Sequence, residues 1–169
     1  MSLEYASVRS IAASNAVQEV GMNIREIGGE NRGPRVDIFS RTATVGVSRD
    51  PSVPSRDWCG MFIYYCYRQA AHFCGMHLPF RPDEDLWSGE KLERWAQRHP
   101  DTIVSDGLVQ PGDIYVAHNY HIGMVTGLVG NDPTLFRSVD GNQSTANSGH
   151  NAVTENVRHL SGCRVIVRI

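Results

Sequence analysis

Cysteine and histidine are the residue types in this chain that could do nucleophilic or metal chemistry, and the sequence has four of the first and seven of the second. Cys59, Cys66 and Cys74 follow one another at intervals of seven and eight residues. Two turns of helix separate side chains by about 10 Å, too far for both to bind one metal ion. No C-x-x-C or H-E-x-x-H motif occurs, so we expect no zinc site. Each cysteine, Cys163 included, is then either an inert buried thiol or a reactive nucleophile.

Cys59 has the best position for a nucleophile. It lies near the start of the most apolar segment of the chain, from Asp57 to Ala71, whose apolar residues have helical spacing. With Asp57 as the N-cap, Cys59 is the second residue of the helix, close to unpaired backbone N–H groups and the positive end of the helix dipole. Such a position stabilises a thiolate. Cys66 and Cys74 lie deeper in the segment or at its end and lack this advantage.

A nucleophilic thiol needs a base, and His121 is the best-placed histidine. It opens a predicted strand, His121-Ile-Gly-Met-Val-Thr126, in which His121, Gly123 and Val125 share one face. His118 is a competing base, but it lies in the connection before the strand, where its direction is poorly fixed. An ordinary structural histidine at the start of a strand is the alternative interpretation.

The base in turn needs a group that fixes its tautomer and stabilises the imidazolium. The next predicted strand ends in Ser138-Val-Asp140-Gly-Asn142, which places Ser138, Asp140 and Asn142 on one face. Either the Asp140 carboxylate or the Asn142 amide could accept the imidazole N–H. Asp-Gly-Asn is also typical of a turn, and a turn at the strand end is compatible with this role.

Helix-forming segments come first in the chain and strand-forming segments afterwards, which predicts one domain over residues 1–169 with a segregated α+β fold. The predicted helices are Ala13–Ile24, Pro34–Thr42, Asp57–Ala71 and Ser88–Gln97, and the predicted strands are Asp113–Ala117, His121–Thr126, Thr134–Val139 and Cys163–Ile169. We expect the polar segment from Gly141 to Asn151 to form a long exposed loop. Helical spacing directs Val17 and Phe73 inward with the other apolar residues of the first and third helices.

The composition excludes several classes of protein. With 16 Lys+Arg against 18 Asp+Glu the net charge is −2, whereas a non-specific nucleic-acid binder needs a basic face. No apolar run approaches the ~18 residues of a membrane span, and residues 1–15 lack the apolar core of a secretory signal. We therefore expect neither nucleic-acid nor membrane binding and no export by the general secretory route. We also expect a monomer.

Together, the motifs resemble those of the CHAP domain, the cysteine, histidine-dependent amidohydrolase/peptidase family, which shares a papain-like catalytic core with the NlpC-like peptidases. The matching motifs are a cysteine after Trp58 at a helix start, the His-x-Gly-x-Val strand that begins at His121, and an acid-Gly-Asn sequence on the next strand. Leu108-Val-Gln-Pro-Gly-Asp-Ile-Tyr115 is similar to the family's proline-glycine-aspartate sequence before its first core strand. Glu26-Ile-Gly-Gly-Glu-Asn-Arg-Gly33 is similar to a segment that precedes the nucleophile in some members. The resemblance covers about residues 10–169.

The resemblance implies that Cys59 is the nucleophile and His121 the general base. Asp140 stands where the family usually has Glu as the third polar member, and Asn142 matches the asparagine two residues later. Which of Asp140 and Asn142 contacts the imidazole stays open. Three further residues are expected to contact the substrate: Trp58, His118 and Tyr120.

Some relatives bind calcium just before the nucleophile. In the corresponding loop of this chain only Asp50 and Asp57 offer carboxylates, too few for the roughly six to eight oxygen ligands that calcium takes. We therefore expect no required metal and no cofactor.

The resemblance also implies hydrolysis of an amide bond of bacterial peptidoglycan, at the sugar–peptide amide or within the stem or cross-bridge peptide, through a cysteine thioester. Such a bacterial or phage protein would be made in the cytoplasm and would act in the periplasm or cell wall, as a phage lytic or tail-associated enzyme or as an injected antibacterial effector. An effector would need a cognate immunity protein as its partner. Two alternatives are a cysteine-dependent deamidase or peptidase that acts on protein, and a non-catalytic wall-binding module.

Overall fold

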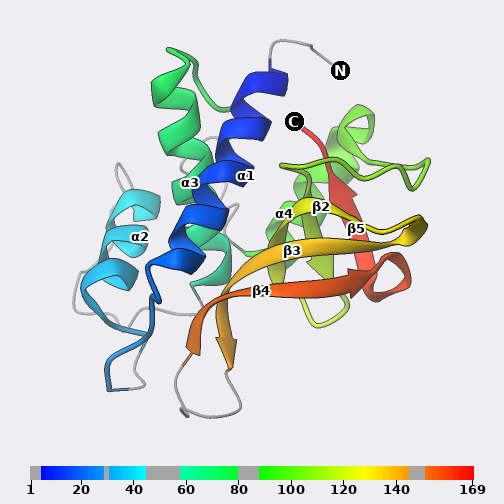
Figure 1. Ribbon diagram of the computed structural model, residues 1–169. Helices are drawn as coiled ribbons and strands as arrows, with labels where there is room; N and C mark the ends of the chain where they lie inside the picture. Colours follow the sequence, from blue (N-terminus) through cyan, green and yellow to red (C-terminus); the bar gives the residue numbers. More distant parts are fainter. Residues whose placement is uncertain (1–4, 29–30, 45–57, 80–87, 145–150) are drawn as a thin grey trace.

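The computed structural model describes residues 5–28, 31–44, 58–79, 88–144 and 151–169. Within these ranges four α-helices precede a five-stranded antiparallel sheet (Figure 1), so the expected α+β class is confirmed. The helices are α1 (Ala6–Gly21), α2 (Pro34–Thr44), α3 (Cys59–Phe73) and α4 (Gly89–Arg98). The strands are β1 (Ile114–Ala117), β2 (Ile122–Val129), β3 (Asp132–Ser144), β4 (Asn151–His159) and β5 (Cys163–Val167). Two short 3₁₀ helices, η3 (Pro100–Thr102) and η4 (Leu160–Gly162), precede β1 and β5.

The sheet has the strand order β4-β3-β2-β1-β5, and every neighbouring pair is antiparallel. The first four strands pair in the order in which they occur in the chain, and β5 returns to pair with the other side of β1. α1 and α3 pack together and against the sheet, and α2 packs on α3 (Figure 1). α3 thereby lies against β2 and β3, and Gly141 of β3 comes close to Trp58 and Phe62 at the start of the helix.

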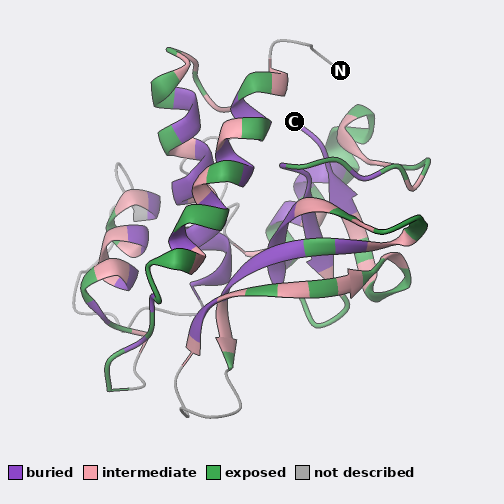
Figure 2. Cartoon of the chain, in the orientation of Figure 1, coloured by how far each residue is buried: buried purple, intermediate pink, exposed green. Residues whose placement is uncertain are grey.

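The main core lies between the helices and the sheet, where the buried residues of both concentrate (Figure 2). Phe62 of α3 packs edge-on against Phe39 of α2, with 5.3 Å between ring centroids. Ile122 and Met124 of β2 face the helices from the sheet and are buried. Because α3 is enclosed by two helices and the sheet, its sequence is an almost continuous apolar run. Among the described residues, no helix is long and apolar enough to cross a membrane.

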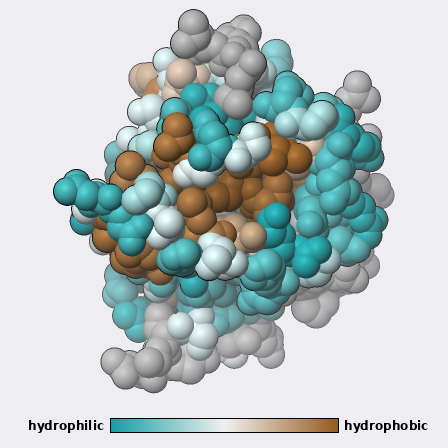
Figure 3. Space-filling view, turned by 90° about the vertical axis from the view of Figure 1, so that its right-hand side faces the viewer, coloured by the Kyte–Doolittle hydropathy of each residue, from teal (hydrophilic) through white to brown (hydrophobic). Residues whose placement is uncertain are grey.

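A smaller buried cluster covers the opposite face of the sheet. Tyr115, Val125, Phe136 and Ile166 project from β1, β2, β3 and β5 into this cluster. The rings of Tyr115 and Phe136 meet edge to face, with centroids 5.4 Å apart. Apolar side chains also gather on the surface that faces right in Figure 1 (Figure 3). Leu128, which pairs with Phe136, is 53% exposed.

Two residues expected in the core lie at the surface. Val17 is 50% exposed, because the buried stripe of α1 runs through Ala12 and Ala16 and leaves Val17 beside it. Phe73 is 81% exposed, because it is the last residue of α3 and extends beyond the helices that pack around the rest.

The expected loop from Gly141 to Asn151 is wrong at both of its ends. β3 continues to Ser144 and β4 begins at Asn151, so the two strands form a long hairpin, and residues 145–150 lie outside the described part of the chain. A polar sequence can form strands here because backbone hydrogen bonds pair β3 with β4 and several polar side chains of the two strands bind one another. The strand that the sequence does not predict, β4, supplies two side chains of the candidate site.

Candidate active site

Cys59 is the first residue of α3, and Trp58 is the N-cap. The sequence predicts a start one residue earlier, with Asp57 as the N-cap, and Asp57 lies outside the described residues. The Trp58 carbonyl accepts the first helical hydrogen bond, from the Phe62 N–H at 2.9 Å. The N–H groups of the first turn have no acceptor within the helix, so Cys59, which is 6% exposed, lies at the positive end of the helix dipole.

Trp58 anchors this helix start. Its ring is fully buried and packs against Phe39, with centroids 5.9 Å apart. The indole Nε1–H donates a hydrogen bond to Glu26 Oε1 at 2.7 Å, and the Glu26 N–H donates to the Asn151 carbonyl at 2.9 Å. The helix start is therefore fastened through this side chain to the segment after α1 and to β4, and contact of Trp58 with substrate stays a prediction.

His121 immediately precedes β2 and is held by a tight turn. Its carbonyl accepts the Ala117 N–H at 2.8 Å, and its N–H donates to Asn119 Oδ1 at 3.2 Å. Tyr120 in this turn has a φ of 64°, in the left-handed region that residues with a Cβ rarely adopt. The turn fixes the direction of the His121 side chain, which is only 12% exposed.

The imidazole of His121 interacts with both Cys59 and Asp140. Its Nε2 lies 3.8 Å from Asp140 Oδ2. Burial lowers the pKa of His121, but the attraction of the imidazolium to Asp140 and Cys59 outweighs burial and raises the pKa to about 9. The histidine therefore favours the imidazolium form at neutral pH, between a thiol and a carboxylate. The structure brings together these three residues of the sequence prediction.

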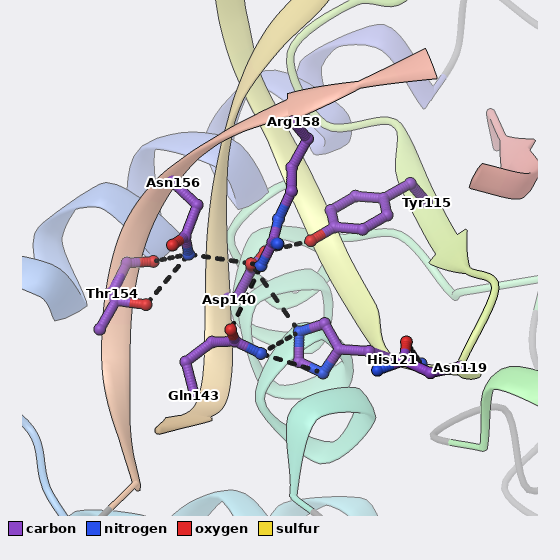
Figure 4. A network of polar contacts seen from close by, with 8 residues as sticks. All are labelled: Tyr115, Asn119, His121, Asp140, Gln143, Thr154, Asn156 and Arg158. Atoms are coloured by element: carbon purple, nitrogen blue, oxygen red, sulfur yellow. Dashed lines mark hydrogen bonds and ion pairs between the residues drawn. The ribbon is translucent and has the colours of Figure 1, made fainter. Parts of the chain in front are cut away.

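Asp140 of β3 is fully buried, and groups from two other strands, β1 and β4, surround its carboxylate (Figure 4). The Tyr115 hydroxyl donates to Oδ1 at 2.7 Å, and Asn156 Nδ2 donates to Oδ2 at 2.9 Å. Arg158 Nη2 also donates to Oδ2. Burial raises the pKa of Asp140, but His121 and Arg158 outweigh burial and hold it below its ordinary value. The carboxylate is therefore kept ionised and fixed beside the imidazole.

A β-bulge in β3 decides which amide reaches the imidazole. Between Asp140 and Gln143, β3 has one residue more than the facing part of β4, and Asn142 has a φ of 59°. Gln143, and not Asn142, therefore lies on the side of Asp140, with its Nε2 3.0 Å from His121 Nε2. Asn142 Oδ1 instead accepts a hydrogen bond from Asn151 Nδ2 at 2.7 Å. Of the two candidates that the sequence leaves open, Asp140 and not Asn142 therefore interacts with the imidazole, because the bulge breaks the alternation of side chains along the strand.

Four residues of the network around Asp140 belong to no motif that the sequence singles out as functional: Tyr115, Gln143, Asn156 and Arg158. The sequence signal for two of them is the period-two spacing of Thr154, Asn156 and Arg158, which is typical of one face of a strand. Tyr115 ends the proline-glycine-aspartate sequence, but that motif does not indicate its contact with Asp140.

His118 and Tyr120 lie in the turn before His121, near the surface. His118 Nε2 lies 3.0 Å from the Ser161 carbonyl oxygen of η4, so its ring is directed to that helix. Tyr120 is 40% exposed, and the Arg164 guanidinium lies over its ring at 4.5 Å from the centroid. Contact of His118 and Tyr120 with substrate stays a prediction.

A small apolar pocket adjoins the site between α3, α4 and the first two strands. It is lined by Gly60, Ile63, Tyr64, Tyr67, Leu92, Ile114 and Ile122. Gly60 follows Cys59 in the chain and Ile122 follows His121. The pocket holds about 270 Å³ of space, part of it open to solvent.

The proline-glycine-aspartate sequence is structural. Asp113 is fully buried, and Arg168 donates to both of its carboxylate oxygens, from Nε at 2.8 Å and from Nη2 at 2.7 Å. Asp113 Oδ2 also accepts the Gln110 N–H at 2.7 Å. These bonds fix the corner that leads into β1, the strand that carries Tyr115.

Within the described ranges, no group of three or more histidine, cysteine, aspartate or glutamate side chains could hold a metal ion. What the site does hold is a thiol at a helix start, a largely buried imidazole that favours its charged form, and a buried carboxylate behind it. This arrangement can generate a thiolate and deliver a proton, the two operations of nucleophilic acyl transfer. The chain matches no protein-family model, and comparison with curated proteins and with solved structures gave no match.

Proposed function

We propose that this protein is a cysteine amidohydrolase with a papain-like (NlpC-like) fold and that it cleaves an amide bond of peptidoglycan. The observation that carries the proposal is the interaction of His121 with both Cys59, at the start of α3, and the buried Asp140 of β3. The order of the motifs that resemble the CHAP domain supports the choice of fold and of substrate.

The reaction proceeds through a covalent thioester. The Cys59 thiolate attacks the carbonyl carbon of the scissile amide and forms a tetrahedral intermediate. The backbone N–H of Cys59, which has no acceptor within the helix, stabilises the oxyanion. The His121 imidazolium gives its proton to the amide nitrogen, the C–N bond breaks and the amine leaves.

Water then completes the cycle. Neutral His121 takes a proton from a water molecule as its oxygen attacks the thioester carbonyl, the C–S bond breaks and a carboxylic acid is released. The thiolate and the imidazolium are thereby restored. Asp140 stays ionised throughout and stabilises each imidazolium, a role that suits a carboxylate held by other donors.

The resemblance also supports a proposal for where the protein acts. The protein acts in the bacterial periplasm or cell wall, as a phage lytic or tail-associated enzyme or as an injected antibacterial effector. In the second case a cognate immunity protein binds it in the producing cell. Co-purification from the native host distinguishes the two, because an effector should bring down a tight binder that covers Cys59.

Mass spectrometry of fragments released from purified sacculi tests the proposal. The wild-type protein should release muropeptides whose masses show hydrolysis of one amide, and these masses identify the bond. Cys59→Ala should release none, whereas Cys74→Ala, at the other end of α3, should match the wild type. Full release by Cys59→Ala would refute the mechanism. Hydrolysis of protein amides with intact sacculi would retain the mechanism and replace the substrate.

A further inference from the structure

Arg158 binds both polar groups that β3 places beside the imidazole. Its Nη2 donates to Asp140 Oδ2 and also to Gln143 Oε1, the latter at 3.3 Å (Figure 4). Gln143 Nε2 in turn lies 3.0 Å from His121 Nε2. The guanidinium also lies over the Tyr115 ring, 5.9 Å from its centroid. One cation from β4 therefore contacts both polar side chains that β3 places beside His121.

Arg158 also competes with His121 for the same carboxylate oxygen. Arg158 and Asn156 both donate to Asp140 Oδ2, whereas His121 Nε2 stays 3.8 Å from it, beyond hydrogen-bond distance. A buried carboxylate without another cation would form a close ion pair with the imidazolium. Such a pair would make the imidazolium a weaker acid toward a leaving amine.

We infer that Arg158 is a positioning residue that holds Asp140 back from His121 and offsets part of its negative charge, so that the imidazolium can release its proton. The inference rests on the proposed function in assigning His121 as the acid. The electrostatic effect of Arg158 on His121 does not depend on any substrate.

Titratable and charged groups reach Asp140 from every neighbouring element. They are Tyr115 of β1, His121 just before β2, Arg158 of β4, Cys163 of β5, which interacts with Asp140 by charge, and Cys59 of α3, which acts through His121. Of these described groups, Arg158 alone carries a positive charge at every pH of interest. Removal of this charge should therefore strengthen the attraction of Asp140 for the imidazolium and raise the titration midpoint of His121.

The test is an NMR titration of the His121 ring Cε1–H in the Cys59→Ser background, assigned by its loss in His121→Gln. Arg158→Gln keeps an amide donor for Asp140 but removes the charge, and should raise the His121 titration midpoint by about one pH unit or more. Arg158→Lys keeps the charge and should raise the His121 midpoint by less than half of the shift seen in Arg158→Gln. Arg137→Gln removes an exposed cation from the same sheet and should leave it unchanged. Arg158→Met, which keeps the aliphatic stem over Tyr115, is a second neutral variant should Arg158→Gln not fold.

A midpoint in the neutral variants within about 0.3 pH units of the parent would overturn the inference, since one pH unit corresponds to 1.36 kcal/mol of interaction. Equal shifts in Arg158→Lys and Arg158→Gln would overturn it as well, because charge would then not be the cause. The titration involves no substrate. It can therefore fail while hydrolysis through Cys59 stands, and it can succeed in a protein that hydrolyses nothing.

Discussion

Gly123 of β2 lies beside Asp140 of β3, and the absence of a side chain at Gly123 makes room for the Asp140 carboxylate. A Cβ at position 123 would overlap both Asp140 Oδ1 and the Tyr115 ring. Gly123 pairs with Tyr115 of β1, so the 2.7 Å hydrogen bond from the Tyr115 hydroxyl to Asp140 passes over the glycine. The glycine of the His-x-Gly-x-Val sequence is thus required by the close approach of the carboxylate to the strand that follows His121.

Gly123→Ala should inactivate the protein. The added methyl group displaces the Asp140 carboxylate, and a displacement of about 1 Å near reacting groups costs about 100-fold in rate. Overpacking should also lower the free energy of unfolding by about 1–3 kcal/mol, measured by urea denaturation. Gly127→Ala on the same strand is the matched control, because a Cβ there meets nothing within 4 Å. Equal activity in the two variants would contradict the assigned role of Asp140.

The two amides after Asp140 should differ in their effect on catalysis. Gln143→Ala removes an amide N–H that only the neutral imidazole, formed after proton transfer, can accept; this hydrogen bond is worth about 1 kcal/mol, so its loss should lower kcat/KM about 5-fold. Asn142→Gly tolerates the positive φ and should stay within about 2-fold of the wild type. Steady-state hydrolysis of isolated muropeptides measures both. A larger loss of kcat/KM in Asn142→Gly than in Gln143→Ala would contradict this, and would favour a regular β3 in which Asn142 lies on the same side as Asp140.

Trp58→Phe should destabilise the start of α3. The variant keeps an aromatic ring but leaves the buried Glu26 without the indole donor, which costs about 1–3 kcal/mol of unfolding free energy. Glu26→Gln keeps an acceptor at the same place and should cost less. Thermal or urea unfolding of the three proteins compares them. If Trp58 instead contacts substrate, Trp58→Phe should raise KM and leave stability unchanged.

The raised pKa of His121 predicts how stability depends on pH. Folding raises this pKa from its ordinary value of 6.5 to about 9, because interactions with Asp140 and Cys59 outweigh burial. His121 therefore contributes stability that is fully present below about pH 6.5 and is lost as the pH rises through about 9. The stability difference between wild type and His121→Gln, measured by urea unfolding, should shrink over this interval. A difference that grows with pH would contradict the assignment.

The sequence predicts the fold class and the three principal residues because each depends on local patterns. Cys59 follows from the start of an apolar helical run, and His121 and Asp140 follow from alternation within short strands. The helix start differs by one residue, since a tryptophan held by a distant glutamate takes the N-cap position.

The remainder of the site depends on contacts between distant segments. The β-bulge that selects Gln143 over Asn142 becomes visible only when β3 is paired with β4. Arg158 and Asn156 lie in a polar sequence, and their role becomes clear only from the buried carboxylate of Asp140 on the neighbouring strand, to which both donate hydrogen bonds. No local propensity encodes such a partner.

Alkylation of Cys59 by iodoacetamide at a series of pH values tests the central claim most directly. If His121 holds the sulfur as a thiolate, Cys59 should react faster than Cys74 at pH 6, and His121→Gln should abolish that advantage. Peptide mass spectrometry resolves the two sites. Equal rates at Cys59 in the wild type and His121→Gln would show that the imidazole does not activate this thiol and would contradict the hydrolase account.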